Sequence, residues 1–248
     1  MTLRWRTVKL IIAFDGTRYE GWQSQRTGKT LQEVFEKILA QFFKVPTPII
    51  GSSRTDSGVH ALGFAAHFKI KSGLGDLKIK KALNFYLPRD ILVHSAKTVH
   101  AGFHARFQAK SKIYRYDIWQ SSTRPLFEAP YVLWHPFALN ARRMRRAAGH
   151  LKGRYDFRSF CNNEEPEKNY VRTLKKISVV KRKQLIRITV QADGFLKQMV
   201  RIIVGTLIEV GRGKMTPKRV SEILLSKDRK LAGPTAKPHG LTLVKVTY

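Results

Sequence analysis

The fold is decided by residues 30–70, TLQEVFEKILAQFFKVPTPIIGSSRTDSGVHALGFAAHFKI, where a helix pattern, a loop and a strand pattern follow one another. Thr30 and Glu33 have the spacing of a capping box, and the apolar residues after them recur every three or four positions. From Phe64 to Ile70, apolar residues occupy every second position instead, which is typical of a strand. We therefore expect a helix and a strand with one apolar face each, separated by a loop at 51–58.

Similar patterns recur in both halves of the chain. Alternation predicts strands near 7–13, 64–70, 91–99, 112–120, 172–181, 184–191 and 241–248. Helical spacing predicts helices at 30–43, 77–86, 140–150 and 196–210, and another that starts at Thr216-Pro217. The order shows no strict β-α-β rhythm, so we expect an α+β fold with mostly antiparallel pairing. We place two α/β domains at residues 1–104 and 105–248, although no linker marks this boundary.

The composition indicates a globular protein with an acidic partner. The chain has 248 residues, 47 Lys+Arg against 17 Asp+Glu, a formal net charge of +30 and 43% hydrophobic residues. This hydrophobic content excludes a disordered polycation, and the charge favours a nucleic acid over an anionic membrane surface. A single cysteine, Cys161, excludes an internal disulfide and favours the cytoplasm. No apolar run reaches the roughly 18 residues that a membrane span needs.

Several basic runs lack acidic neighbours. The predicted helix at 140–150 carries Arg142, Arg143, Arg145 and Arg146, and lysine runs recur near residues 78–81, 175–176 and 181–183. A solvated surface explains most such runs, but their repetition here favours contacts with a phosphate backbone. The acidic cluster Glu164, Glu165 and Glu167 around Pro166 has no matched histidines, and we expect it in a surface loop.

The loop Gly51-Ser52-Ser53-Arg54-Thr55-Asp56-Ser57-Gly58 carries a lone carboxylate between two apolar stretches. Its composition favours an Asx-type turn in which Asp56 bonds backbone amides. The other interpretation is a turn that presents Asp56 for chemistry, and composition leaves this second possibility open.

Further residues around and beyond this loop carry a family resemblance. Arg54-Thr55-Asp56-Ser57-Gly58-Val59-His60-Ala61 resembles the signature of the tRNA pseudouridine synthase A family. Other matches follow in the family's order: Phe14-Asp15-Gly16-Thr17, Gly21-Trp22-Gln23, Phe103-His104-Ala105-Arg106-Phe107, Tyr114-Arg115-Tyr116, Gly194-Phe195-Leu196, Met199-Val200-Arg201 and His239-Gly240-Leu241. The resemblance covers nearly the whole chain.

The resemblance implies a reaction and a fold. The reaction is the isomerisation of uridine to pseudouridine in the anticodon stem-loop of tRNA, at positions 38–40, with a flipped base. It requires no redox step, nucleotide cofactor or metal. The implied fold is the pseudouridine synthase fold, two α/β subdomains whose mostly antiparallel mixed sheet is flanked by helices around a basic cleft. A homodimer without membrane association is implied as well.

The resemblance also gives roles to individual residues. Asp56 matches the catalytic aspartate, which attacks either the sugar or the uracil ring, and Arg201 matches the arginine paired with it. Tyr114 matches the tyrosine that stacks on the target base and takes its proton. Arg54 matches the arginine that replaces the flipped nucleotide, and Leu196 lines the uracil pocket. Without the resemblance, each of these residues has an ordinary structural interpretation. Tyr114 and Leu196 would be core residues, and Arg54 and Arg201 would be surface residues.

Three other classes of protein compete with this interpretation. A non-catalytic basic RNA-binding protein would explain the charge, but not the joint match of Asp56, Tyr114 and Arg201. A zinc deaminase needs a cysteine pair that one cysteine cannot supply. A Rossmann methyltransferase needs a glycine-rich turn between a strand and a helix, and the sequence shows none.

Overall fold

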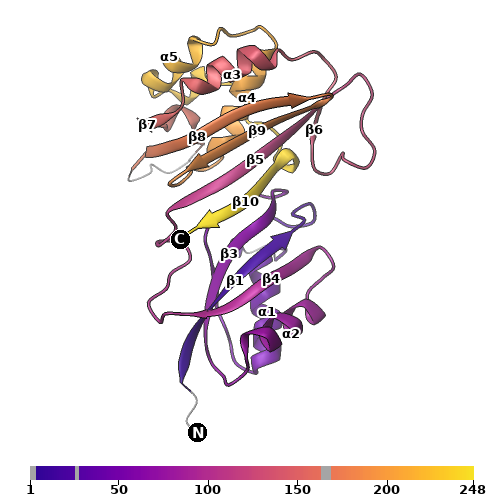
Figure 1. Cartoon of the computed structure of the whole chain (residues 1–248), viewed down its shortest axis with the longest axis vertical. Coiled ribbons are helices and arrows are strands. Elements are labelled where there is room, and N and C mark those ends of the chain that lie inside the picture. Colours follow the sequence, from indigo (N-terminus) through magenta and orange to yellow (C-terminus); the bar gives the residue numbers. More distant parts are fainter. Residues whose placement is uncertain (1–3, 26–27, 163–168) are drawn as a thin grey trace. The chain divides into compact units, whose positions relative to one another are not determined.

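The computed structural model describes residues 4–25, 28–162 and 169–248, and the chain forms two compact units (Figure 1). Unit 1 spans residues 1–110 and 243–248, and unit 2 spans residues 111–242. The boundary predicted from the sequence lies after residue 104, and the inclusion of the last residues of the chain in unit 1 was not predicted. The C-terminal strand of the chain therefore lies beside a strand of unit 1.

Unit 1 is a sheet with two helices packed against it (Figure 1). Its strand order is β4-β1-β3-β10, with the short β2 beside β3, and β1 pairs antiparallel with both β3 and β4. The elements are β1 (Trp5–Phe14), α1 (Leu31–Phe43), β2 (Ile49–Gly51), β3 (His60–Lys71), α2 (Asp76–Tyr86), β4 (Ile91–Val99) and β10 (Leu241–Thr247), the last belonging to unit 1 from Leu243 onward.

The predicted alternation builds the core of unit 1. Leu10 on β1 lies opposite Ala66 on β3, and Ile12 lies opposite Phe64, and all four are fully buried. The predicted capping box is confirmed: the Thr30 hydroxyl accepts a hydrogen bond from the Glu33 amide at 3.4 Å, and the Glu33 carboxylate accepts one from the Thr30 amide at 3.2 Å. Helix α1 therefore begins where its local sequence specifies.

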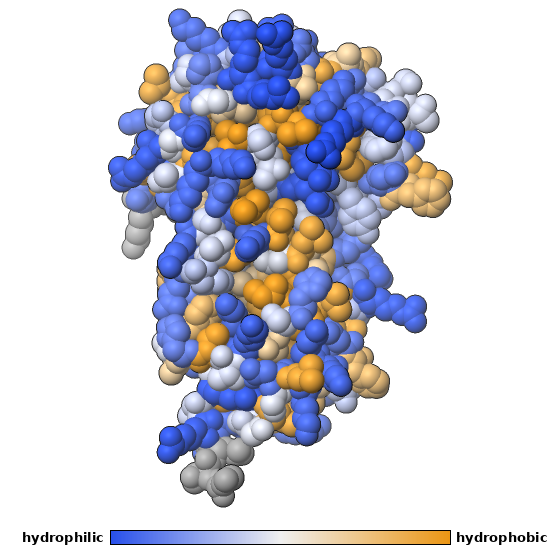
Figure 2. Space-filling view, in the orientation of Figure 1, coloured by the Kyte–Doolittle hydropathy of each residue, from blue (hydrophilic) through white to orange (hydrophobic). Residues whose placement is uncertain are grey.

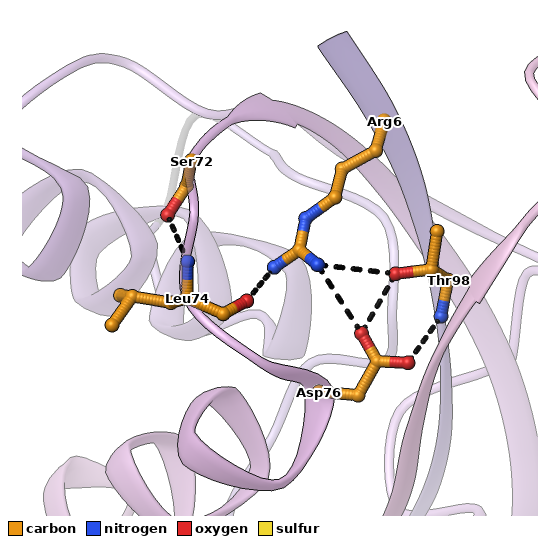
Figure 3. Close-up of polar contacts among 5 residues, drawn as sticks. All are labelled: Arg6, Ser72, Leu74, Asp76 and Thr98. Carbon is orange, nitrogen blue, oxygen red and sulfur yellow. Dashed lines mark hydrogen bonds and ion pairs between the residues drawn. The ribbon is translucent and has the colours of Figure 1, made fainter. Parts of the chain in front are cut away.

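A polar network fixes the start of α2 against the sheet (Figure 3). Asp76 accepts hydrogen bonds from the Thr98 amide at 2.8 Å and the Thr98 hydroxyl at 2.7 Å, and it forms an ion pair with Arg6 at 3.5 Å. The Arg6 guanidinium also donates to the carbonyl of Leu74. Burial acts to raise the pKa of Asp76, but the bonds from Thr98 and the charge of Arg6 outweigh it and lower that pKa. One carboxylate thus joins α2, β4 and β1.

The strands of unit 2 follow the order β5-β9-β8-β7, and helices pack against them (Figure 1). The three pairings along this order are antiparallel, whereas β6 pairs parallel with β5. The elements are β5 (Ser111–Gln120), β6 (Leu133–His135), α3 (Ala141–Gly149), β7 (Gly153–Asp156), β8 (Val171–Arg182), β9 (Leu185–Ala192), α4 (Met199–Gly211) and α5 (Arg219–Ser226), with 3-10 turns at Arg158–Phe160, Arg229–Leu231 and Pro238–Gly240.

Helix α4 forms the centre of unit 2, since nearly all its residues are buried. A Cβ added to Gly205 would lie 1.7 Å from the carbonyl oxygen of Pro234, so only glycine allows this backbone approach. Gly233 makes the matching contact, because its added Cβ would lie 2.7 Å from the Thr206 Cα, and its amide donates to the Thr206 hydroxyl at 2.9 Å. The segment at 233–236 is therefore pressed directly onto α4.

The observed elements confirm an α+β fold with a mostly antiparallel sheet, and five α-helices lie within the described residues. Two predicted helix starts are wrong. Helix α4 begins at Met199 rather than Leu196, because Gln198 adopts the left-handed conformation (φ 58°) at its N-cap. Helix α5 begins at Arg219, after a turn in which the Thr216 hydroxyl accepts from the Arg219 amide at 3.2 Å. The three shortest strands, β2, β6 and β7, were not predicted.

Two further expectations concern the acidic cluster and membrane-spanning helices. The acidic cluster Glu164, Glu165 and Glu167 lies outside the described residues. Within the ranges that the structure describes, no helix combines the length and the apolar character that a membrane crossing requires.

Candidate active site

Asp56 lies in the loop between β2 and β3 of unit 1. The Asp56 carbonyl accepts a hydrogen bond from the Val59 amide at 3.2 Å, which closes a turn that contains Gly58 at φ 74°. Arg54 and Ser57 are exposed, while Asp56 is half-buried. We call residues 52–59 the Asp56 loop. Its backbone forms the turn that the small residues predicted.

The Asp56 loop is held by a second loop, at residues 15–22. The Trp22 amide donates to the carbonyl of Thr55 at 3.2 Å, and the Gly58 amide donates to the carbonyl of Tyr19 at 3.2 Å. The Ser57 hydroxyl donates to the same Tyr19 carbonyl, also at 3.2 Å. These bonds fix the backbone on both sides of Asp56.

Two glycines allow the loops to approach this closely. A Cβ on Gly16 would lie 2.0 Å from the Val59 carbonyl oxygen. Gly21 has a φ of +93°, and a Cβ there would lie 2.3 Å from the Thr55 carbonyl oxygen. Both glycines belong to matched motifs, but their packing against the Asp56 loop was not predicted. Both glycines lie far from residue 56 in the sequence, so no local sequence pattern indicates this contact.

The holding loop is itself anchored in unit 1. The Tyr19 hydroxyl donates to Asp90 at 2.7 Å, and burial together with this carboxylate raises the pKa of Tyr19. The Trp22 ring stacks on Phe64 with 4.2 Å between ring centroids. The Nδ1 atom of His60 lies 3.1 Å from the Gly16 amide nitrogen. The loop that holds the Asp56 loop is thus anchored by contacts with Asp90, Phe64 and His60.

Tyr114 lies on β5 in unit 2, where it is 7% exposed. Tyr114 pairs with Val190 and Tyr116 with Ile188, so the two tyrosines share one face of the sheet, as the alternation predicted. The Phe195 ring packs edge-on against Tyr114 with 5.1 Å between centroids. The Tyr116 hydroxyl donates to the Lys237 carbonyl at 2.7 Å, and burial raises the pKa of Tyr116.

The opposite face of β5 carries the charged residues of the same motif. Asp117 accepts two hydrogen bonds from Arg187, at 2.8 and 3.0 Å, and pairs with Arg115 at 3.2 Å. The bond to Asp117 raises the pKa of Arg187. This cluster fixes β5 to β9 on the side away from Tyr114.

Arg201 lies in the first turn of α4 and is half-buried. Its Nε donates to the carbonyl of Ala236 at 2.7 Å, and the Ala236 amide donates back to the carbonyl of Arg201 at 3.1 Å. Its charge also acts on Tyr116, where it opposes the effect of burial on the pKa. Arg201 is therefore no freely rotating surface arginine, because the segment pressed onto α4 fixes its guanidinium through Nε.

Leu196 is 5% exposed, and its carbonyl accepts from the Met199 amide at 3.1 Å in the turn before α4. Among the residues singled out from the sequence, Arg54 and Asp56 belong to unit 1, while Tyr114, Leu196 and Arg201 belong to unit 2. Phe195 was quoted only as a motif residue, and its contact with Tyr114 was not predicted. The roles given to all five residues stay predictions.

Among residues 4–25, 28–162 and 169–248, no three or more His, Cys, Asp or Glu side chains gather in a group that could hold a metal ion.

Comparison with known proteins gives consistent matches. A family model described as tRNA pseudouridine synthase matches residues 10–108 and 147–248. The chain is 43% identical over 242 residues to tRNA pseudouridine synthase A of Geobacillus kaustophilus, covering 97% of this chain and 94% of the relative. It is 45% identical over 245 residues to the protein of the same name from Geotalea uraniireducens, covering 98% and 100%. It is also 42% identical over 243 residues to tRNA pseudouridine synthase A 2 of Clostridium perfringens, again covering 98% and 100%.

Proposed function

Because this chain belongs to the tRNA pseudouridine synthase family and isomerises uridine to pseudouridine in tRNA, we propose that Asp56, Tyr114 and Arg201 carry out the reaction. The reaction breaks the glycosidic bond at N1 of uracil, rejoins the base to the sugar through C5 and removes the proton from C5. No atom is gained or lost, so the chemistry needs a nucleophile, a means to hold the detached base and a proton acceptor.

Asp56 is the proposed nucleophile. The observation that supports this role best is the support of its loop, in which backbone bonds to Tyr19 and Trp22 and the close approach of Gly16 and Gly21 fix the turn. A turn that only satisfied its own backbone would not need a second loop pressed onto it. A fixed carboxylate can attack a flipped nucleotide without first being ordered.

Tyr114 and Arg201 have complementary proposed roles. The Tyr114 ring, buried against Phe195, would stack on the target base. Its side-chain oxygen, as the phenolate, would accept the proton that C5 loses, and N1 of the rejoined base would gain a proton, so that the reaction balances. The guanidinium of Arg201 would pair with Asp56 and stabilise its charge during the reaction. Leu196 would line the apolar side of the base, and the exposed Arg54 would fill the place that the flipped nucleotide leaves in the stem.

The finer identity of the substrate and the assembly belongs to the proposal. We take uridines 38–40 of the anticodon stem-loop as the targets, bound in a basic cleft, and a homodimer in the cytoplasm as the active form. The net charge of +30 supports a tRNA substrate, since phosphate contacts by Lys and Arg supply sequence-independent affinity.

The test is to map pseudouridine in an unmodified tRNA transcript after incubation with the wild-type chain, Asp56→Asn and Asp56→Ala. Both variants should lose turnover, because neither supplies a nucleophilic carboxylate, yet both should bind tRNA within a few-fold of wild type. Ser57→Ala is the matched control: it removes the neighbouring hydroxyl bond to Tyr19 and should keep turnover.

Appreciable turnover by Asp56→Ala would remove the proposed nucleophile. If the wild-type chain bound tRNA but formed no pseudouridine, the alternative of a non-catalytic RNA-binding protein would be correct.

A further inference from the structure

A short turn in unit 1, Phe103-His104-Ala105-Arg106-Phe107, presents an aromatic ring at the surface. Phe107 is 75% exposed. Its ring nevertheless has a fixed neighbour, because it stacks on the His104 imidazole with 4.2 Å between centroids and 24° between planes. We call residues 103–107 the aromatic turn.

The buried half of the aromatic turn is tied down firmly. The Ala105 amide donates to Nδ1 of His67 at 3.2 Å, and the Ala105 carbonyl accepts from the Tyr248 hydroxyl at 2.8 Å. Phe103 is 6% exposed and packs against His67 and Tyr248, with centroid distances of 5.7 and 4.9 Å. The middle of the turn therefore cannot move without disturbing the core of unit 1.

His104 carries this rigidity to the exposed half. Its Nδ1 accepts from the Arg106 amide at 3.2 Å and lies 3.3 Å from the Phe107 amide nitrogen, so the imidazole fixes the backbone of both exposed residues. The same ring supports one face of Phe107. Phe107 is held in place before any ligand arrives, and little conformational entropy remains to be lost on binding.

The surroundings of the ring are cationic. The Arg106 side chain is exposed, and its guanidinium carbon lies 5.8 Å from the centroid of the Phe107 ring. Between Asp90 and Asp117 the sequence contains no acidic residue. A fixed, exposed aromatic ring beside an arginine is the arrangement that proteins use to stack a nucleic-acid base and contact its phosphate.

We infer that the aromatic turn binds an unpaired nucleobase of the tRNA substrate, which stacks on the exposed face of Phe107 while Arg106 contacts the adjoining phosphate. This inference rests on the proposed function for its ligand, but it assigns a binding contact separate from Asp56, Tyr114 and Arg201. A single ring with a neighbouring cation is too small for a stable protein interface and lacks the apolar area for a lipid surface.

The experiment measures binding of an unmodified tRNA transcript to Phe107→Ala, Phe107→Leu and Phe107→Trp in the full-length chain. Each is combined with Asp56→Ala, so that binding is read without turnover. Loss of one stacked base should weaken binding about tenfold in the Ala and Leu variants, whereas Trp should retain the affinity. The Trp variant should also show fluorescence quenching by tRNA beyond that of the tryptophans already present.

The matched control is Phe85→Ala on α2, because Phe85 is 81% exposed in the same unit and packs edge-on against Tyr86. It should bind tRNA like the parent chain. His104→Asn tests the positioning role and should reduce the quenching in the Trp variant. Unchanged affinity of Phe107→Ala would overturn the inference, as would equal losses with Ala, Leu and Trp. Loss of affinity for anionic vesicles alone would assign the turn to a membrane and also overturn it.

A failure of the proposed function would look different. It would appear as absent pseudouridine in the wild-type reaction, whatever the Phe107 variants do to binding.

Discussion

Gly16 illustrates how one residue without a side chain decides where a chemical group lies. An alanine Cβ there would lie 2.0 Å from the Val59 carbonyl oxygen, which is far inside van der Waals contact, so the loop at 15–22 or the Asp56 loop must shift. For Gly16→Ala we expect a loss of about 1–3 kcal/mol in the free energy of unfolding. Turnover should fall more than tRNA affinity, because Asp56 is displaced.

Denaturant unfolding and initial rates of pseudouridine formation measure the two effects. Gly149→Ala is the control, since a Cβ at Gly149 would meet nothing within 4 Å. That variant should match wild type in both measurements. Wild-type turnover by Gly16→Ala would contradict the role given to the loop contact.

His67 makes a second prediction at this scale, on the pH dependence of stability. Burial, with smaller effects from His104 and Lys69, lowers the pKa of His67 to about 4 from an ordinary value near 6.5. Between these values the unfolded chain binds a proton that the folded chain does not, so the unfolding free energy falls as the pH drops from about 6.5 to about 4.

In the His67→Gln variant this part of the acid destabilisation should disappear, a difference of about 3 kcal/mol across that pH range. Urea unfolding at several pH values measures it. His94→Gln, at an exposed position on β4, is the control and should keep the wild-type pH dependence. Parallel wild-type and His67→Gln curves would show that His67 does not titrate in this range.

At the scale of elements, the first residue of α2 decides how that helix is attached to the sheet. Asp76→Asn keeps the shape of the side chain but removes its negative charge. That charge pairs with Arg6, and it also strengthens the hydrogen bonds that Thr98 donates. We expect a loss of about 1–2 kcal/mol in the free energy of unfolding at pH 7.

The sign of the pH effect follows from the lowered pKa of Asp76. Stabilisation by the carboxylate is fully present above the pKa of the unfolded group, near 4, and is lost as the pH falls through the lower pKa of the folded group. The wild type and Asp76→Asn should therefore differ at pH 7 and converge in strong acid. Thr98→Val removes the hydroxyl that donates to Asp76 and accepts from Arg6 but keeps the ion pair and the Thr98 amide bond, and it should give a smaller loss at pH 7. An equal difference between the wild type and Asp76→Asn at every pH would contradict the assignment.

At the scale of the whole molecule, the effect of the excess positive charge depends on which basic side chains face solvent. Figure 2 shows hydrophilic residues gathered around α3 and α5, with apolar residues between them. On α3, Arg145 donates to the Val179 carbonyl at 3.1 Å and Arg143 to the Met215 carbonyl at 3.4 Å, whereas Arg142 and Arg146 are exposed. Arg143 is half-buried and Arg145 is exposed, but both hydrogen-bond to backbone carbonyls, which sets them apart from Arg142 and Arg146.

The double variant Arg142→Glu/Arg146→Glu should bind tRNA more weakly and with a smaller dependence on salt concentration, because fewer counterions are released when phosphates are neutralised. Binding of a tRNA transcript at several salt concentrations gives the log–log slope. Lys37→Glu, at an exposed position on α1, changes the net charge by half as much and reports the effect of net charge away from α3. An unchanged slope in the double variant would show that Arg142 and Arg146 do not contact phosphate.

Much of the fold could be read from the sequence because it depends on neighbours along the chain. Capping by Thr30 and Glu33, the alternation of β1 and β3 and the shared face of Tyr114 and Tyr116 follow from local geometry, and the structure agrees with each. The starts of α4 and α5 were misplaced, because a left-handed residue and a threonine turn interrupt patterns that otherwise look helical.

The sequence by itself determined the class of fold, the basic character and, through its motifs, the family and the residues proposed for the chemistry. Only the tertiary structure decided which contacts hold those residues in place. These contacts are the close approach of Gly21 to Thr55, the packing of Phe195 on Tyr114 and the close approach of the Pro234 carbonyl to Gly205. Periodicity reports which face of an element is apolar. It cannot report which distant backbone reaches that face, because such contacts depend on the path of the whole chain.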